Sequence, residues 1–297
     1  MSISPSNIIR FKKTGKQFIF EQIHLDIARN ATDDFNLFHD KKKCQQITNN
    51  PFNGPILLGF QLEALIEDQV KKYRSQEKHI VDSHLLFSNY HFNFAGAINP
   101  GEPFELDIKK TRQDIKAGTV SNRICIKKDR RLVLSGLKKN SARPLYLADA
   151  DFKDLGNLST LDDFSFVLDQ RYFLKKKYIT TSNAKNLLTG SLIEQSDYID
   201  EVEEKINFPE MFPCSFISCA LLEKAKIENL DFCKNPSVYT QHKISINLEL
   251  NKSLKSNDPL YILVENVPFG QSTQLNCYGL TQSKQILFRS IISLSEI

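Results

Sequence analysis

The clearest apolar segment of the chain covers residues 54–70, GPILLGFQLEALIEDQV. Its apolar residues fall on more than one face of a helix, a pattern typical of a helix that is buried on most sides. Pro55 suits the first helical position, where its missing N–H removes no hydrogen bond. The segment is too short to span a membrane comfortably, and it carries Glu63, Glu67 and Asp68. The pattern predicts a buried helix.

Strand-like segments follow this helix, beginning after the turn NPGEP. The second half of the chain repeats the order, with a short apolar helix predicted over 212–226, FPCSFISCALLEKAK. Alternating or β-branched patterns predict strands. These strand segments are 104–110, 120–126, 132–137, 244–250, 260–265, 274–280 and 286–294.

The two halves match when one is shifted by 156 residues. The shift places Phe104 on Leu260, Pro103 on Pro259 and Ile98 on Leu254. A repeated unit of one helix and several antiparallel strands predicts an α+β fold, whose two sheets pair edge to edge across a pseudo-twofold axis. The expected boundaries are a first domain at 1–148, a linker at 149–165 and a second domain at 166–297.

Composition fits this two-unit prediction. The 297 residues are 41% hydrophobic and 25% charged, which is ordinary for globular domains. The first 150 residues hold 24 Lys and Arg against 16 Asp and Glu, whereas the remainder holds 15 against 19. The overall charge of +4 is too small to indicate nucleic-acid binding, but the basic half predicts an anionic partner. No secretory signal or membrane span is evident, and six cysteines without zinc spacing predict free thiols, so we expect a cytoplasmic protein.

Candidate chemistry lies just before the first predicted helix, in DFNLFH (34–39) and GPILLG (54–59). Asp34 and His39 stand five residues apart on a loop, so both side chains can point into one cavity and shuttle protons. The N-terminal N–H groups of the adjacent helix can bind an anionic oxygen. Acid–base groups beside an oxyanion site are what reversible addition of water to an α,β-unsaturated thioester requires.

These two segments resemble the D-x-N-P-x-H and G-x-P-I-x-H-G motifs of MaoC-like hydratases, the (R)-specific enoyl hydratase or hydratase 2 branch of the hot-dog superfamily. The resemblance covers residues 20–145 and implies a double hot-dog fold. It implies that Asp34 and His39 form the catalytic dyad, that Asn36 supports the loop, and that the Gly59 N–H contacts the thioester carbonyl. The sequence departs from the motifs at two positions, where Leu37 stands in place of the usual Pro and Leu58 in place of the usual His.

The resemblance predicts a lyase that dehydrates 3-hydroxyacyl thioesters or hydrates trans-2-enoyl thioesters in fatty acid or polyketide metabolism. The substrate would be carried on CoA or an acyl carrier protein, with no metal or other cofactor. Lys41, Lys42 and Lys43 are either a solvated charge run or contacts for the phosphate of the carrier arm. We expect a monomer, in which the two halves form a pseudo-dimer, or a homodimer.

The second half offers Asp197 and Asp200 but no His at the required offset, so we expect it to be degenerate and structural. Two alternatives stay open, namely a hot-dog thioesterase and a non-catalytic acyl-binding or assembly subunit. His91 and His242 lie in strand-like segments and are predicted to be structural. Cys214 near the second apolar helix is predicted to pack in the core, because no His or Asp partner is near it in sequence.

Overall fold

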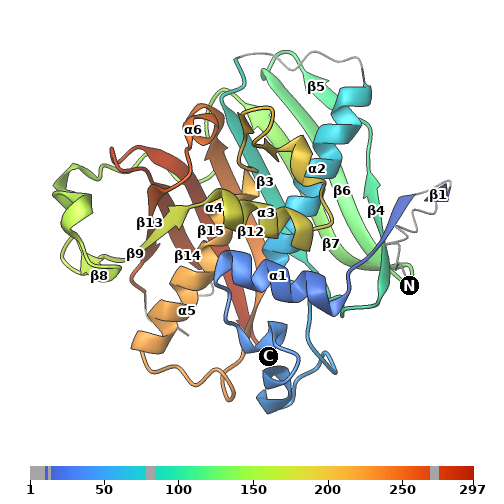
Figure 1. The fold of residues 1–297 in the computed structure, drawn as a ribbon, viewed down its shortest axis with the longest axis horizontal. Coiled ribbons are helices and arrows are strands. Elements are labelled where there is room, and N and C mark those ends of the chain that lie inside the picture. The colour runs from blue at the N-terminus through green and yellow to red at the C-terminus, as the bar shows by residue number, and fades with distance from the viewer. Residues whose placement is uncertain (1–10, 13–14, 78–83, 268–273) are drawn as a thin grey trace.

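The computed structural model describes residues 11–12, 15–77, 84–267 and 274–297 (Figure 1). Among these residues, 13 strands form one sheet in which every paired neighbour is antiparallel. Across this sheet the strands are β1 (Phe11–Lys12), β2 (Gly15–Ile19), β4 (Pro103–Ile108), β6 (Thr119–Lys128), β7 (Arg131–Ser141), β3 (Phe87–Phe94), β12 (Ser237–Asn247), β15 (Ile286–Glu296), β14 (Gln274–Leu280), β13 (Asp258–Glu265), β9 (Tyr172–Ile179) and β8 (Phe164–Val167). Strand β5 (Arg112–Asp114) pairs with β6, and β10 (Ile199–Asp200) pairs with β11 (Lys205–Ile206).

The centre of the sheet is the antiparallel pair β3 and β12, where the two halves of the chain meet. Tyr90 lies opposite Ile244 in this pair, and His91 lies opposite Lys243. Outward from the centre, β7 corresponds to β15, β6 to β14, β4 to β13 and β2 to β9. The order of strands therefore repeats about this pair, as the sequence pattern predicts, and both halves share one continuous sheet.

Helices α1 to α5 lie together in front of the sheet in Figure 1. The main helix of the first half is α2, and its counterpart in the second half is divided into α4 and α5. An apolar core joins both halves, because Phe60 and Leu65 of α2 belong to the same cluster as Phe212 and Ile217. The helices are α1 (Gln22–Thr32), α2 (Gly59–Gln76), α3 (Thr181–Gly190), α4 (Met211–Ser215), α5 (Ile217–Ile227) and α6 (Leu248–Ser253).

Helices α1 and α3 occupy equivalent places in the two halves and pack against each other. The two helices lie very close at Gly190, where an added Cβ would lie 2.9 Å from both the Ala28 nitrogen and the His24 oxygen. Only glycine fits such a close backbone approach. Gln61 of α2 also donates to the Gly190 carbonyl, so this glycine ties the first-half helices to α3.

The structure corrects two predicted boundaries. The first helix begins at Gly59, because the segment before it is extended and its Ile56 and Leu57 N–H groups donate to the carbonyls of Phe38 and Ile98. Pro55 is therefore outside the helix, and the prediction of a helical Pro55 was wrong. The strand predicted over 244–250 is the end of β12, which begins at Ser237 and ends at Asn247. The chain leaves the strand there because the Asn247 side chain caps α6.

The predicted linker packs on the second half of the sheet. Its short 3-10 helices η3 (Lys153–Leu155) and η4 (Leu158–Thr160) place Phe152, Leu155 and Leu158 against an apolar cluster that includes Tyr261 of β13. Strand β8 then pairs with β9. The boundaries at 148 and 165 stay predictions.

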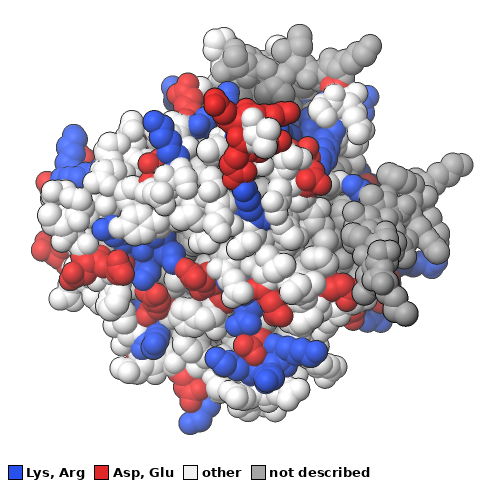
Figure 2. Space-filling model, in the orientation of Figure 1, with Lys and Arg blue, Asp and Glu red and all other residues white. Residues whose placement is uncertain are grey.

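The described helices include none that is long and apolar enough to cross a membrane. All six cysteines lie among the described residues and are free thiols, as predicted. Figure 2 shows acidic and basic side chains mixed over the face that carries the helices. On this face the charge difference between the halves therefore does not form a surface of one sign.

Candidate active site

A tight loop after α1 positions Asp34 and Asn36. Helix α1 ends at Thr32, its C-cap residue Asp33 is in the left-handed conformation (φ 51°), and the Asp34 N–H donates back to the Arg29 carbonyl. Asp34 Oδ1 then accepts from the Asn36 N–H at 3.0 Å, and Asn36 Oδ1 accepts from the Phe38 N–H at 3.1 Å. Two successive side-chain turns of this kind fix the loop locally. Asn36 thus has the loop-supporting geometry that the resemblance implies.

His39 lies in the 3-10 helix η1 (Leu37–His39), and its ring is held by the extended segment before α2. The Nδ1 atom lies 2.8 Å from the Ile56 carbonyl oxygen. A carbonyl only accepts, so Nδ1 carries the proton, and in the neutral ring Nε2 keeps its lone pair. Nε2 faces Asp34 Oδ2 at 3.8 Å, and the two residues are only 5% and 4% exposed. Their reactive atoms can therefore contact one substrate oxygen between them.

An apolar cavity of about 280 Å³ opens beside this pair. Asn36, His39 and Gly59 line it, whereas Asp34 reaches it through His39. The wall opposite comes from the second half, from α5, β12 and the loop between them. These second-half wall residues include Leu221, Leu222, Ala225, Phe232, Val238 and Tyr239. Both halves are therefore needed to form the cavity.

Gly59 is the first residue of α2, so its N–H lies at the positive end of the helix and has no partner within it. A Cβ on Gly59 would lie 3.2 Å from the Phe94 ring, which also lines the cavity. A side chain at this position would therefore crowd the Phe94 ring at the wall of the cavity. Leu58, the departure before it, is buried in the core.

The three lysines after His39 lie outside the cavity. Lys42 and Lys43 are exposed, and their backbone N–H groups donate to Asp40. Lys41 is also exposed and lines a second, more open hollow that shares Phe52 and Ala97 with the cavity. Lys41 thus lines a hollow that borders the cavity. Their contact with a phosphate stays a prediction.

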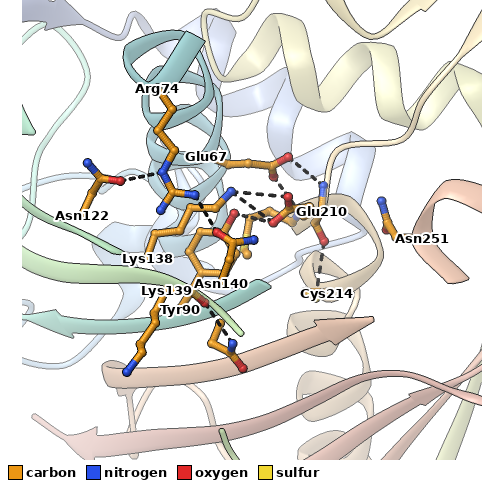
Figure 3. Close-up of polar contacts among 12 residues, drawn as sticks. Glu67, Arg74, Tyr90, Asn122, Lys138, Lys139, Asn140, Glu210, Cys214 and Asn251 are labelled. Carbon is orange, nitrogen blue, oxygen red and sulfur yellow. Dashed lines mark hydrogen bonds and ion pairs between the residues drawn. The ribbon is translucent and has the colours of Figure 1, made fainter. Parts of the chain in front are cut away.

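The equivalent place in the second half is filled by side chains of the protein itself (Figure 3). Helix α4 begins at Met211, as α2 begins at Gly59, but its amides are already bonded. The N–H groups of Glu210 and Met211 donate to the two carboxylate oxygens of Glu67 at 2.8 and 2.9 Å. Asp197 pairs with Lys72 on the surface, and Asp200 accepts from the backbone of its own turn. No acid–base pair faces a cavity here among the described residues.

This filled site is an extended polar network. Glu210 accepts from the Tyr90 hydroxyl at 2.6 Å and lies 3.3 Å from Lys138 Nζ (Figure 3). Burial, and then repulsion by Glu210, raise the pKa of Glu67 to about 8. Burial opposes ionisation of Glu210 as well, but Lys138 and the hydrogen bonds to Glu210 outweigh it and lower its pKa. The network therefore holds one carboxylate that is readily ionised and one that is not.

Tyr239 is a polar residue of the cavity that was missed from the sequence. Tyr239 lines the cavity and pairs with Ser218 at 2.8 Å, and burial followed by the charge of Asp34 raises its pKa well above the ordinary value. His242, predicted to be structural, is fully buried and bonded to Glu63 of α2. His91 does not line the cavity. No local sequence pattern could reveal the contact of His242 with Glu63, because it joins the two halves.

Comparison with solved structures identifies the fold. Over 95% of both chains, this chain is similar to a MaoC-like dehydratase with a TM-score of 0.56 and 9% identity. A MaoC-like dehydratase from Phytophthora capsici matches over the same shares with a TM-score of 0.55 and 8% identity. The fold is a double hot dog. The predicted fold class is thus confirmed.

A third similar structure is the full-length peroxisomal multifunctional enzyme type 2 from Drosophila melanogaster. The match has a TM-score of 0.54 and 8% identity, and it covers 95% of this chain but 48% of the other. No protein-family model matches the sequence, and a search of curated proteins finds no match. At these identities, the structural likeness shows the fold and leaves the reaction to be argued from the site.

Proposed function

We propose that this protein is a hydro-lyase that interconverts 3-hydroxyacyl and trans-2-enoyl thioesters, as the (R)-specific MaoC-like hydratases do. The observation that carries the proposal is the buried Asp34–His39 pair beside both an apolar cavity and the N-terminus of α2. The pair supplies acid–base groups, the helix supplies an oxyanion site, and the cavity accommodates an acyl chain. The carrier would be CoA or an acyl carrier protein, and no cofactor is required.

The proposed dehydration begins with the thioester carbonyl accepting from the Gly59 N–H, which acidifies the proton on Cα. His39 Nε2, which keeps its lone pair because Nδ1 donates to Ile56, removes that proton. Asp34 faces the same nitrogen and assists transfer of the proton to the departing β-hydroxyl. The departing water consists of the β-hydroxyl group and the proton that was removed from Cα. Hydration follows the same steps in reverse.

The proposal is tested with crotonyl-CoA and with crotonyl carried on acyl carrier protein. We expect loss of the enoyl absorbance without release of the free thiol, and formation of the 3-hydroxyacyl product. Release of free thiol without loss of the enoyl group would instead indicate a thioesterase. Binding of the thioester with neither reaction would indicate an acyl-binding subunit.

The second half is proposed to form the wall for the acyl chain, which makes Ala225 a test position. Ala225 is buried in α5 and lines the cavity. Ala225→Leu is expected to lower kcat/KM for long enoyl chains by about 10- to 200-fold relative to crotonyl thioester, because added carbons narrow the pocket. Steady-state rates over a series of chain lengths measure this ratio.

The matched control is Lys226→Leu, which adds a leucine at the exposed neighbouring position of α5. It should leave the chain-length profile unchanged. Equal losses for short and long chains in Ala225→Leu would show that this wall does not contact the acyl chain.

A further inference from the structure

Tyr239 lines the cavity from the second half, and the proposed mechanism does not use it. It lies on β12, where the pairing with β15 shifts register between Tyr239 and Gln241. Thr240 is therefore the extra residue of a β-bulge. In a regular strand, residues three apart point to opposite faces, whereas here the centroids of the Tyr239 and His242 rings lie 4.4 Å apart. The bulge thus turns Tyr239 to the side of the sheet that carries the helices.

The Tyr239 hydroxyl has a hydrogen to give to a ligand. It pairs with the Ser218 hydroxyl of α5 at 2.8 Å, and neither group forms another hydrogen bond among the described residues. Each hydroxyl carries one hydrogen, so one of the two hydrogens is unused. Ser218 is 1% exposed and does not line the cavity, so an unused hydrogen there would be buried without an acceptor, at a cost in stability. Ser218 is therefore the donor in the pair, and Tyr239 keeps its hydrogen for the cavity.

The electrostatics place this hydroxyl near the acid–base pair and keep it protonated. Burial, and then the charge of Asp34, raise the pKa of Tyr239 well above its ordinary value. The effect of a charge falls with distance, so the hydroxyl lies near the Asp34 carboxylate. Asp34 Oδ2 and His39 Nε2, which are 3.8 Å apart, form no hydrogen bond with any described residue. A substrate oxygen that contacts these two atoms can take a third hydrogen bond from Tyr239 on the opposite wall.

We propose that Tyr239 is a third catalytic residue, whose hydroxyl donates a hydrogen bond to the β-oxygen of the substrate. In dehydration the bond between Cβ and this oxygen breaks, and its electron pair goes to the oxygen, which takes its proton from the Asp34–His39 pair. Tyr239 keeps its own proton and stabilises the negative charge that develops on the oxygen. In hydration the same hydroxyl orients the attacking water. This inference rests on the proposed function and adds a second-half residue to its chemistry.

Tyr239→Phe is the most informative variant, because it removes the hydroxyl and keeps the ring. We expect kcat for hydration of crotonyl-CoA to fall about 10- to 100-fold, the range typical of one hydrogen bond to a developing charge. Crotonyl-CoA has no β-oxygen until water adds, so KM should change less than about threefold. Steady-state kinetics measure this split.

Ser218→Ala is the matched control, because it breaks the same hydrogen bond from the other side and leaves the Tyr239 hydroxyl in place. Its kcat should stay within about threefold of wild type, although its thermal unfolding midpoint should fall about as much as that of Tyr239→Phe. If the bond serves only to hold α5 on β12, the two variants should lose equal activity.

The second measurement is independent of turnover and compares two ligands that differ only in the β-oxygen. Binding of (R)-3-hydroxybutyryl-CoA and butyryl-CoA is measured by calorimetry in the His39→Ala background, which prevents conversion of the first ligand. Adding Tyr239→Phe should weaken binding of the hydroxy ligand about 3- to 10-fold relative to butyryl-CoA. Circular dichroism establishes that each variant is folded.

The outcomes separate the inference from the proposed function. Equal kcat in wild type and Tyr239→Phe, or equal losses in Tyr239→Phe and Ser218→Ala, would overturn the inference and leave the hydratase proposal intact. A wild type that does not hydrate crotonyl-CoA, together with a preference for the hydroxy ligand that disappears in Tyr239→Phe, would support the contact and reject the reaction. Failure to bind either thioester would overturn both.

Discussion

Replacing His39 by Ala is expected to lower kcat/KM for crotonyl-CoA hydration by about 10²- to 10⁴-fold, the contribution typical of a positioned acid–base group. The imidazole lines the cavity, and its tautomer is defined because Nδ1–H donates to the Ile56 carbonyl oxygen. Alanine removes the lone pair that takes the Cα proton. Steady-state kinetics with the purified variant measure the loss.

Asp34→Asn is expected to have a comparable effect with little change in the fold. The asparagine oxygen can still accept from the Asn36 N–H, as Asp34 Oδ1 does at 3.0 Å. The variant loses the negative charge that faces His39 Nε2. An unaltered thermal unfolding midpoint together with a large loss of kcat/KM would assign the effect to chemistry.

Asp40→Asn is the matched control on the same loop. Asp40 pairs with Arg29 and accepts from the Lys42 and Lys43 N–H groups, but it does not line the cavity. We expect its activity to stay within about twofold of wild type. If His39→Ala and Asp34→Asn are as active as Asp40→Asn, the dyad assignment is incorrect.

The sequence predicts the parts of this site that depend on local structure. Asp34, Asn36 and His39 lie within six consecutive residues, and successive Asx-type turns at Asp34 and Asn36 shape their loop locally. The helix that begins at Gly59 is recognisable from its own apolar pattern. The repeat of helix and strands is likewise visible along the chain, because each half buries the same kind of helix under the same kind of sheet.

The remaining features depend on contacts between segments that are distant in the sequence. The start of α2 at Gly59 and not at Pro55 is decided by the N–H groups of Ile56 and Leu57, which bond to distant carbonyls. Tyr239 and His242 approach the cavity only because β12 pairs with β3 at the centre of the sheet. Local propensity carries no information on such pairings, so the second-half wall could be expected in general but not residue by residue.

Glu67 provides the largest expected effect of pH on stability. Its pKa is raised from the ordinary 4.5 to about 8 by burial and by Glu210. Between these pH values the unfolded chain has released the proton that the folded protein retains, so the free energy of unfolding falls as pH rises. For this fully buried group the expected loss is about 3–5 kcal/mol between pH 4.5 and pH 8, at about 1.4 kcal/mol for each pH unit.

Glu67→Gln is expected to abolish this part of the pH dependence. At pH 5 the variant should be less stable than wild type by about 1 kcal/mol, because the amide nitrogen cannot accept from one of the two N–H groups of Glu210 and Met211. Near pH 8.5 it should be the more stable protein, because wild type then holds two buried carboxylates around Lys138. Urea unfolding of both proteins at each pH measures their free energies of unfolding and shows which protein is more stable. The contributions of other titrating groups cancel in the difference between the two free energies.

Glu203→Gln, at an exposed position of the second half, is the control for loss of a carboxylate. It should leave the free energy of unfolding within about 0.5 kcal/mol of wild type at both pH values. A constant difference between wild type and Glu67→Gln from pH 5 to pH 8.5 would show that Glu67 is ionised throughout this range. In that case Lys138 and the two N–H groups at α4 would stabilise both carboxylates together, and the filled site would not respond to pH.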